Sequence, residues 1–90
     1  MNREKYYQAA AVALQKFYGG SSYRSYDPQD AAHLESVAAN ILMARDGMNG
    51  GSFADAVVRN DLAAAVGRAD DACLQHLAFL VYCRQYVVVN

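Results

Sequence analysis

Residues 27–46 read DPQDAAHLESVAANILMARD, and this stretch decides the fold class. Asp27 suits the N-cap of a helix, Pro28 suits its first turn, and Asp30 takes the third helical position, where a carboxylate completes a capping box. Apolar residues then recur at three- and four-residue steps until Gly47 provides a stop. The pattern predicts a helix over 28–46 whose buried face consists of Leu34, Val37 or Ala38, Ile41 and Leu42.

An apolar stripe before this stretch predicts a first helix over residues 3–18. Gly19-Gly20 ends it, because glycine adopts the left-handed conformation of a helix terminus without a Cβ penalty. The stripe consists of Tyr6, Ala10, Ala13, Leu14 and Phe17, which share one face of a helix.

Two further helices are expected in the C-terminal half. Ser52, with an acidic residue three positions later, is expected as the N-cap of a short helix over 53–59. Asn60-Asp61 predicts a break, after which Asp61 caps the next helix. The helical period of apolar residues then persists to Tyr86, so we expect one long helix over 62–86, which Gly67 or the acidic pair 70–71 could kink or split.

The composition supports a compact antiparallel bundle of four to five helices in a single domain, residues 1–90. Hydrophobic residues make up 54% of the chain, and there is only one proline to interrupt helices. The net charge of −1 and the scattered basic residues disfavour a binder of duplex nucleic acid. No apolar run approaches the roughly 20 residues of a membrane span, and two cysteines ten residues apart in one predicted helix cannot pair. We therefore expect a cytoplasmic protein, in the host cytoplasm if a phage encodes it.

Cys73-x-x-His76 is the motif most suggestive of metal or thiol chemistry. A structural zinc site needs four ligands, and the remaining candidates, His33 and Cys83, have no supporting spacing. A thiol nucleophile would need an orienting acid and an oxyanion donor, and the sequence shows neither. Small buried side chains explain the motif better, so the sequence predicts no metal, no cofactor and no catalytic residue; the protein is not expected to be an enzyme.

The loop GGSSYRSY, residues 19–26, is the strongest candidate for a binding surface. It gathers tyrosines, serines and one arginine, a mixture typical of recognition surfaces. Rings can stack on a base, and a guanidinium can meet a phosphate. The candidate ligand-binding residues here are Tyr18, Tyr23, Arg24 and Tyr26. The alternative, in which these tyrosines pack over the end of the bundle, stays open.

A second polar group follows the Gly-rich turn at 47–51. Ser52 stands at a helix N-terminus, where free N–H groups attract anions. Arg59, Asn60 and Arg68 complete the candidate ligand-binding set. Alternatively, the turn is merely capped, and Asp61 pairs with Arg68 within one helix.

Residues 50–70, GGSFADAVVRNDLAAAVGRAD, resemble a group of small phage- and prophage-encoded helical accessory proteins. The shared pattern is glycine–Phe–alanine–Val–Asn–Asp–Leu–Arg–Ala–Asp, and weaker similarity continues into Leu77 and 81–83. Members continue into a tryptophan-containing tail, which this chain lacks before it stops at Asn90. The resemblance implies a phage accessory protein, a class that often counters host defence.

These observations lead us to expect a phage-type counter-defence protein that sequesters a small nucleotide-type immune signal without catalysis. The alternatives are a protein-binding, anti-CRISPR-like inhibitor of a host defence complex and a structural or regulatory phage protein. The chain holds more apolar side chains than one small core hides, so we expect a homodimer or a higher even oligomer. The expected interface consists of Tyr82, Tyr86 and residues 87–89.

Overall fold

The computed structural model describes residues 3–19 and 26–89, which form six α-helices, one short 3-10 helix and no strand. The prediction of an all-α fold is therefore confirmed. None of the helices in this described part is long and apolar enough to cross a membrane. The elements are α1 (Glu4–Gly19), η1 (Pro28–Asp30), α2 (Ala31–Arg45), α3 (Ser52–Val58), α4 (Leu62–Arg68), α5 (Asp71–Gln75) and α6 (Leu77–Tyr86).

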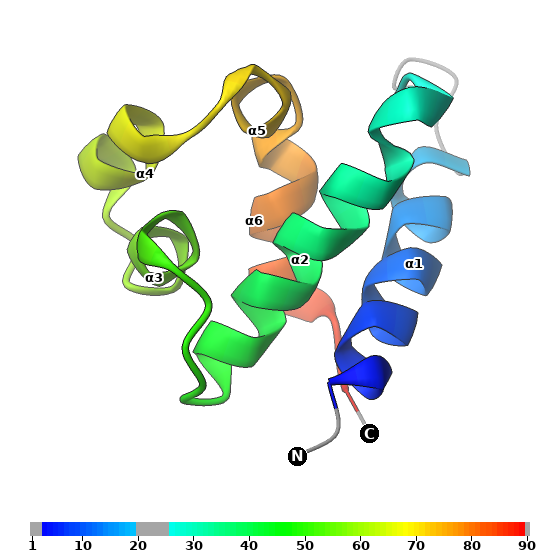
Figure 1. The fold of residues 1–90 in the computed structure, drawn as a ribbon, viewed down its shortest axis with the longest axis horizontal. Coiled ribbons are helices and arrows are strands. Elements are labelled where there is room, and N and C mark those ends of the chain that lie inside the picture. The colour runs from blue at the N-terminus through cyan, green and yellow to red at the C-terminus, as the bar shows by residue number, and fades with distance from the viewer. Residues whose placement is uncertain (1–2, 20–25, 90) are drawn as a thin grey trace.

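Three long helices, α1, α2 and α6, enclose the core. In Figure 1, α1 runs upward while α2 and α6 run downward, and the shorter α3 and α4 lie to the left of α2. Alanines on the facing sides of α1 and α2 are fully or almost fully buried, which allows the two helices to approach closely. The largest fully buried side chains are Leu14, Leu34, Ile41, Leu42, Met43, Phe79, Leu80 and Cys83.

Helix caps account for most of the predicted boundaries. Asp27 accepts a hydrogen bond from the Gln29 N–H at 2.9 Å, and Pro28 opens the first turn, which is 3-10 rather than α. Asp61 accepts one from the Ala64 N–H at 3.1 Å. Asn60 has a φ of 60°, a left-handed conformation that asparagine tolerates, and this ends α3 as the sequence predicted.

The prediction that Ser52 caps α3 is wrong. The N-cap is Gly51, with a φ of +93°, and Ser52 is the first residue of the helix. A positive φ disfavours any side chain with a Cβ, so the chain enters the helix through the glycine. The helix consequently begins one residue earlier than predicted.

The prediction of one long helix over 62–86 is also wrong, and the alternative, a split at the acidic pair 70–71, is what the structure shows. After α4 the backbone is extended at Ala69, and Asp70 accepts a hydrogen bond from the Cys73 N–H at 2.8 Å, which starts a new helix. A carboxylate that caps this N–H replaces the carbonyl acceptor of a continuous helix. A second break falls at His76, whose φ and ψ are −112° and 24°.

The C-terminal tail folds back onto its own chain instead of standing free. Val87 and Val89 are half-buried and pack against the core, as does Tyr82, whereas Tyr86 and Val88 are 70% and 75% exposed. Inward and outward side chains alternate because the backbone becomes extended at Val87. The predicted apolar patch is therefore reduced to two strongly exposed residues.

Candidate functional site

A groove of about 480 Å³ lies between α1 and the end of α6. Pockets for small molecules usually measure about 300–1,000 Å³, so the groove has the size for a nucleotide-like ligand. Figure 1 shows the start of α1 and the end of α6 at the lower end of the molecule, and the lining of the groove extends from there along α1 as far as Lys16. We call it the lysine–tyrosine groove; its lining residues are Lys5, Gln8, Ala9, Val12, Ala13, Lys16, Tyr82, Tyr86, Val87 and Val88.

The α1 wall of this groove carries two positive charges. Lys5 and Lys16 are eleven positions apart, so they share one face of α1, about 16 Å apart along its axis. Lys5 Nζ lies 5.3 Å from the centroid of the Tyr6 ring. No carboxylate accompanies the two lysines among the described residues that line the groove, so this wall favours an anion.

The α6 wall supplies two aromatic rings. Tyr82 and Tyr86 are one turn apart, with ring centroids 5.6 Å apart and planes at 45°. Tyr82 is braced by Phe17, whose ring centroid lies 5.2 Å away. Tyr86 is largely exposed, and an exposed ring beside cations suits a planar ligand with negative charge.

Arg45 fixes the position of the α6 wall, although it does not line the groove. Its Nη1 donates to the carbonyl oxygen of Val87 at 2.6 Å, and to those of Cys83 and Arg84 at 3.3 and 3.4 Å. These are carbonyls at the C-terminal end of a helix, where a cation also interacts favourably with the helix dipole. Sequence reasoning missed this role, because α2 and the end of α6 are far apart in the chain.

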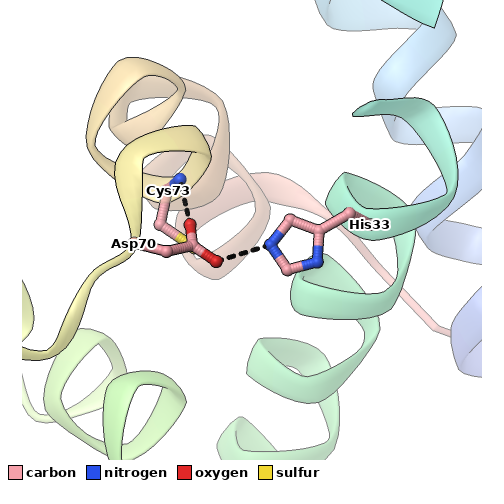
Figure 2. Close-up of side chains that lie close together, drawn as sticks. All are labelled: His33, Asp70 and Cys73. Carbon is pink, nitrogen blue, oxygen red and sulfur yellow. Dashed lines mark hydrogen bonds and ion pairs between the residues drawn. The ribbon is translucent and has the colours of Figure 1, made fainter. Parts of the chain in front are cut away.

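A second group of polar side chains joins α2 to the start of α5 (Figure 2). His33 Nε2 lies 2.8 Å from Asp70 Oδ2, while Asp70 Oδ1 accepts the Cys73 N–H. The donor atoms of His33, Asp70 and Cys73 all lie within 4.8 Å of one another. We call these three residues the His33–Asp70–Cys73 cluster.

The cluster shifts the pKa values of two of its members. The Cys73 backbone N–H holds the pKa of Asp70 below its ordinary value, and hydrogen bonds from the Cys73 and His33 side chains add to this. Burial raises the pKa of the Cys73 thiol to about 12, and the neighbouring Asp70 adds to the increase. The free thiol is therefore protonated and unreactive at neutral pH.

His76, the residue that the sequence paired with Cys73, has a different partner. Its Nδ1 lies 2.6 Å from the Tyr18 hydroxyl oxygen, and both side chains are buried. Its Nε2 is buried without a hydrogen-bond partner among the described residues. The break in helix geometry falls at this same residue.

The candidate binding residues predicted from the sequence fall in separate regions. Tyr23 and Arg24 lie outside the described residues, so the loop prediction stays a prediction. Tyr18 is in the core, and half-buried Tyr26 packs on it with ring centroids 5.1 Å apart. The others, Ser52, Arg59, Asn60 and Arg68, are exposed on or beside α3 and α4.

Two residues of this group, Arg59 and Asn60, make a hydrogen bond or line a groove. Arg59 Nε donates to the Asp55 carbonyl oxygen within its own helix at 3.3 Å, and Asn60 lines a smaller groove of about 120 Å³. Arg68 is the last residue of α4. Asp61 and Arg68 do not form the predicted ion pair within residues 3–19 and 26–89. Asp61 caps α4 instead.

None of the predicted binding residues that the structure describes lines the lysine–tyrosine groove. A signal for its α1 wall was available, since Lys5, Gln8, Val12 and Lys16 recur at helical spacing.

No protein-family model matches the chain, and no curated protein or solved structure is significantly similar to it.

Proposed function

We propose that this protein is a phage-type counter-defence protein that binds a small nucleotide-type immune signal in the lysine–tyrosine groove. It holds the signal without converting it. The observation that carries the proposal is the pairing of two lysines, with no carboxylate among the described lining residues, with an exposed tyrosine ring across a nucleotide-sized groove. The resemblance of residues 50–70 to phage accessory proteins supplies the biological setting.

The two walls contribute unequally to affinity in this proposal. A base stacked on an aromatic ring gains about 1–3 kcal/mol, whereas an exposed ion pair gains roughly 1 kcal/mol or less. Tyr86 therefore acts as the anchor, and Lys5 and Lys16 attract and orient the phosphates. Replacing Tyr86 with alanine should weaken binding about tenfold to a hundredfold, and replacing Lys16 about threefold, with a smaller dependence on salt.

The experiment measures binding of a panel of linear and cyclic nucleotides by calorimetry. Tyr7→Ala is the matched control, because Tyr7 is an exposed tyrosine on α1 outside the groove lining. We expect Tyr86→Ala to lose affinity and Tyr7→Ala to retain it. Equal affinities in the two variants, or no binding of any nucleotide by the wild type, would refute the proposal.

A release assay tests the absence of catalysis. The protein is incubated with the nucleotide that binds, heat-denatured and removed, and the supernatant is analysed by mass spectrometry. Recovery of the intact nucleotide supports sequestration. Recovery of a hydrolysed or rearranged product would instead identify an enzyme.

An apolar surface on α4 and α6 favours a second candidate function, binding to a host defence protein. Leu62 is 68% exposed, and Val66 and Val81 are 44% and 41% exposed. Leu62 and Val81 also line the smaller groove of about 120 Å³. For a protein-binding inhibitor, Leu62→Glu should abolish inhibition of the defence complex, whereas for a sequestering protein it should leave nucleotide binding unchanged.

A further inference from the structure

We propose that His33, Asp70 and Cys73 bind a divalent transition-metal ion, with Zn²⁺ the best-fitting occupant. The site joins α2 to α5 and is separate from the lysine–tyrosine groove (Figure 2). It is independent of the proposed nucleotide binding, because it shares no residue with the groove.

The donor atoms are already close to the separation that a metal requires. Ligands at about 2.0–2.3 Å from a tetrahedral ion lie roughly 3.3–3.7 Å from one another. The imidazole nitrogen and carboxylate oxygen are 2.8 Å apart, and all three donors lie within 4.8 Å of one another. Small side-chain rotations suffice to admit an ion, since the side chains of His33 and Asp70 are 46% and 54% exposed.

The donor set selects the class of ion. One imidazole nitrogen, one carboxylate oxygen and one thiolate sulfur suit Zn²⁺ or Co²⁺, whereas Mg²⁺ and Ca²⁺ prefer oxygen ligands alone. The Cys73 thiol is protonated in the free protein, so the ion displaces its proton to solvent as the metal–sulfur bond forms. Three protein ligands leave the fourth tetrahedral position to a water molecule. The exposed sides of His33 and Asp70 provide the route by which ion and water enter.

The start of α5 orients two of the ligands in advance. Asp70 holds the Cys73 N–H with Oδ1, which fixes the carboxylate and directs Oδ2 toward His33. Asp70 and Cys73 are three residues apart at a helix start, so both side chains lie on the side that faces α2 in Figure 2. A bound ion would cross-link the junction between α4 and α5 to the first turn of α2.

Helix capping together with a surface ion pair accounts for Asp70 and His33 without any metal. That account uses the backbone N–H of Cys73 and the hydrogen bond from its side chain to Asp70, both of which a serine can supply, whereas a metal site requires the sulfur. The Cys73→Ser variant keeps the N–H and removes the sulfur, so it separates the two explanations. His33→Gln is a second test at an exposed position, where loss of folding is not expected.

The test uses the untagged full-length chain, freed of metal by a chelator and titrated with Co²⁺ and then Zn²⁺. We expect one ion per chain, an absorption band from charge transfer between sulfur and Co²⁺, and loss of this band when Zn²⁺ is added. Cys73→Ser should abolish the band, and His33→Gln should weaken Zn²⁺ binding at least about tenfold, since even an outer partner of a ligand contributes this much. Cys83→Ser is the matched control, because it removes the other buried thiol outside the cluster.

A stability measurement gives an independent readout. Free Zn²⁺ at about a hundredfold excess over its dissociation constant should raise the melting temperature of the wild type by roughly 10 °C or more, and that of His33→Gln much less. The proposal is overturned if the wild type fails to bind Zn²⁺ at micromolar concentrations. It is equally overturned if folded His33→Gln and Cys73→Ser, checked by circular dichroism, bind Zn²⁺ as tightly as Cys83→Ser.

Discussion

Replacing Arg45 with methionine removes the guanidinium that binds the end of α6 while keeping most of the buried aliphatic stem. The bond from Nη1 to the Val87 carbonyl, at 2.6 Å, is short and charge-assisted, whereas those to Cys83 and Arg84 are long and weak. A hydrogen bond involving a charged group contributes about 1.5–3 kcal/mol. We therefore expect the free energy of unfolding to fall by about 2 kcal/mol, which lowers the melting temperature by roughly 8–16 °C.

Arg59→Met is the matched control for this variant. Arg59 is exposed, and its Nε donates only to a carbonyl of its own helix at 3.3 Å, so its loss should change the stability by less than about 0.5 kcal/mol. Thermal denaturation followed by circular dichroism compares the two. Equal melting temperatures for Arg45→Met and Arg59→Met would refute the role of Arg45. If nucleotides bind in the groove, Arg45→Met should also weaken their binding, because Val87 lines the groove.

Three further predictions concern caps, acid stability and assembly. Asp61→Ala should cost about 1 kcal/mol in thermal denaturation, whereas Ser52→Ala should cost much less, because Gly51 is the N-cap of α3; equal losses would contradict these caps. The pKa of Asp70 is lower in the folded protein than in the unfolded chain, because the Cys73 N–H binds its carboxylate. The ionised carboxylate therefore stabilises the fold above the unfolded pKa of about 3.9, and this stabilisation is lost as the pH falls through the lower folded pKa. Urea unfolding of Asp70→Asn should therefore depend less on pH below about 4 than that of the wild type, and identical pH profiles would contradict this. Light scattering at micromolar concentration should give the mass of a dimer or a higher even oligomer. Val88→Glu should shift it toward a monomer and, because Val88 also lines the lysine–tyrosine groove, should weaken nucleotide binding as well; a monomeric wild type would exclude this assembly.

The helices that follow local rules were predictable from the sequence. The stop at Gly47, the first turn at Pro28 and the caps at Asp27 and Asp61 depend on side chains within one turn of the boundary. The break at His76 has no such local signal. The His76 side chain makes no cap hydrogen bond and instead contacts Tyr18, which is 58 positions away in the sequence.

The candidate sites were less predictable for the same reason. Lys5 and Lys16 visibly share a face of α1, but only the docking of α6 places Tyr82 and Tyr86 opposite them. His33 and Asp70 are 37 positions apart. The spacing of Cys73 and His76 suggested His76 as the histidine near Cys73, whereas His33 is the one in the cluster. Spacing shows which side chains share a helix face, whereas a site between helices depends on their packing.

The helix breaks in the C-terminal half show how competition for one backbone N–H can bring functional side chains together. A continuous helix over 62–86 would satisfy the Cys73 N–H with the carbonyl four residues earlier, leaving Asp70 free to move in solvent. In the observed fold, Asp70 takes that N–H, which ends one helix, starts the next and fixes the carboxylate in one orientation. The break also places α5 against α2, where His33 meets the second carboxylate oxygen. The same capping bond thus shapes the fold and assembles the His33–Asp70–Cys73 cluster, so the Asp70→Asn variant, which can still cap, should preserve the fold while removing the negative charge from the cluster.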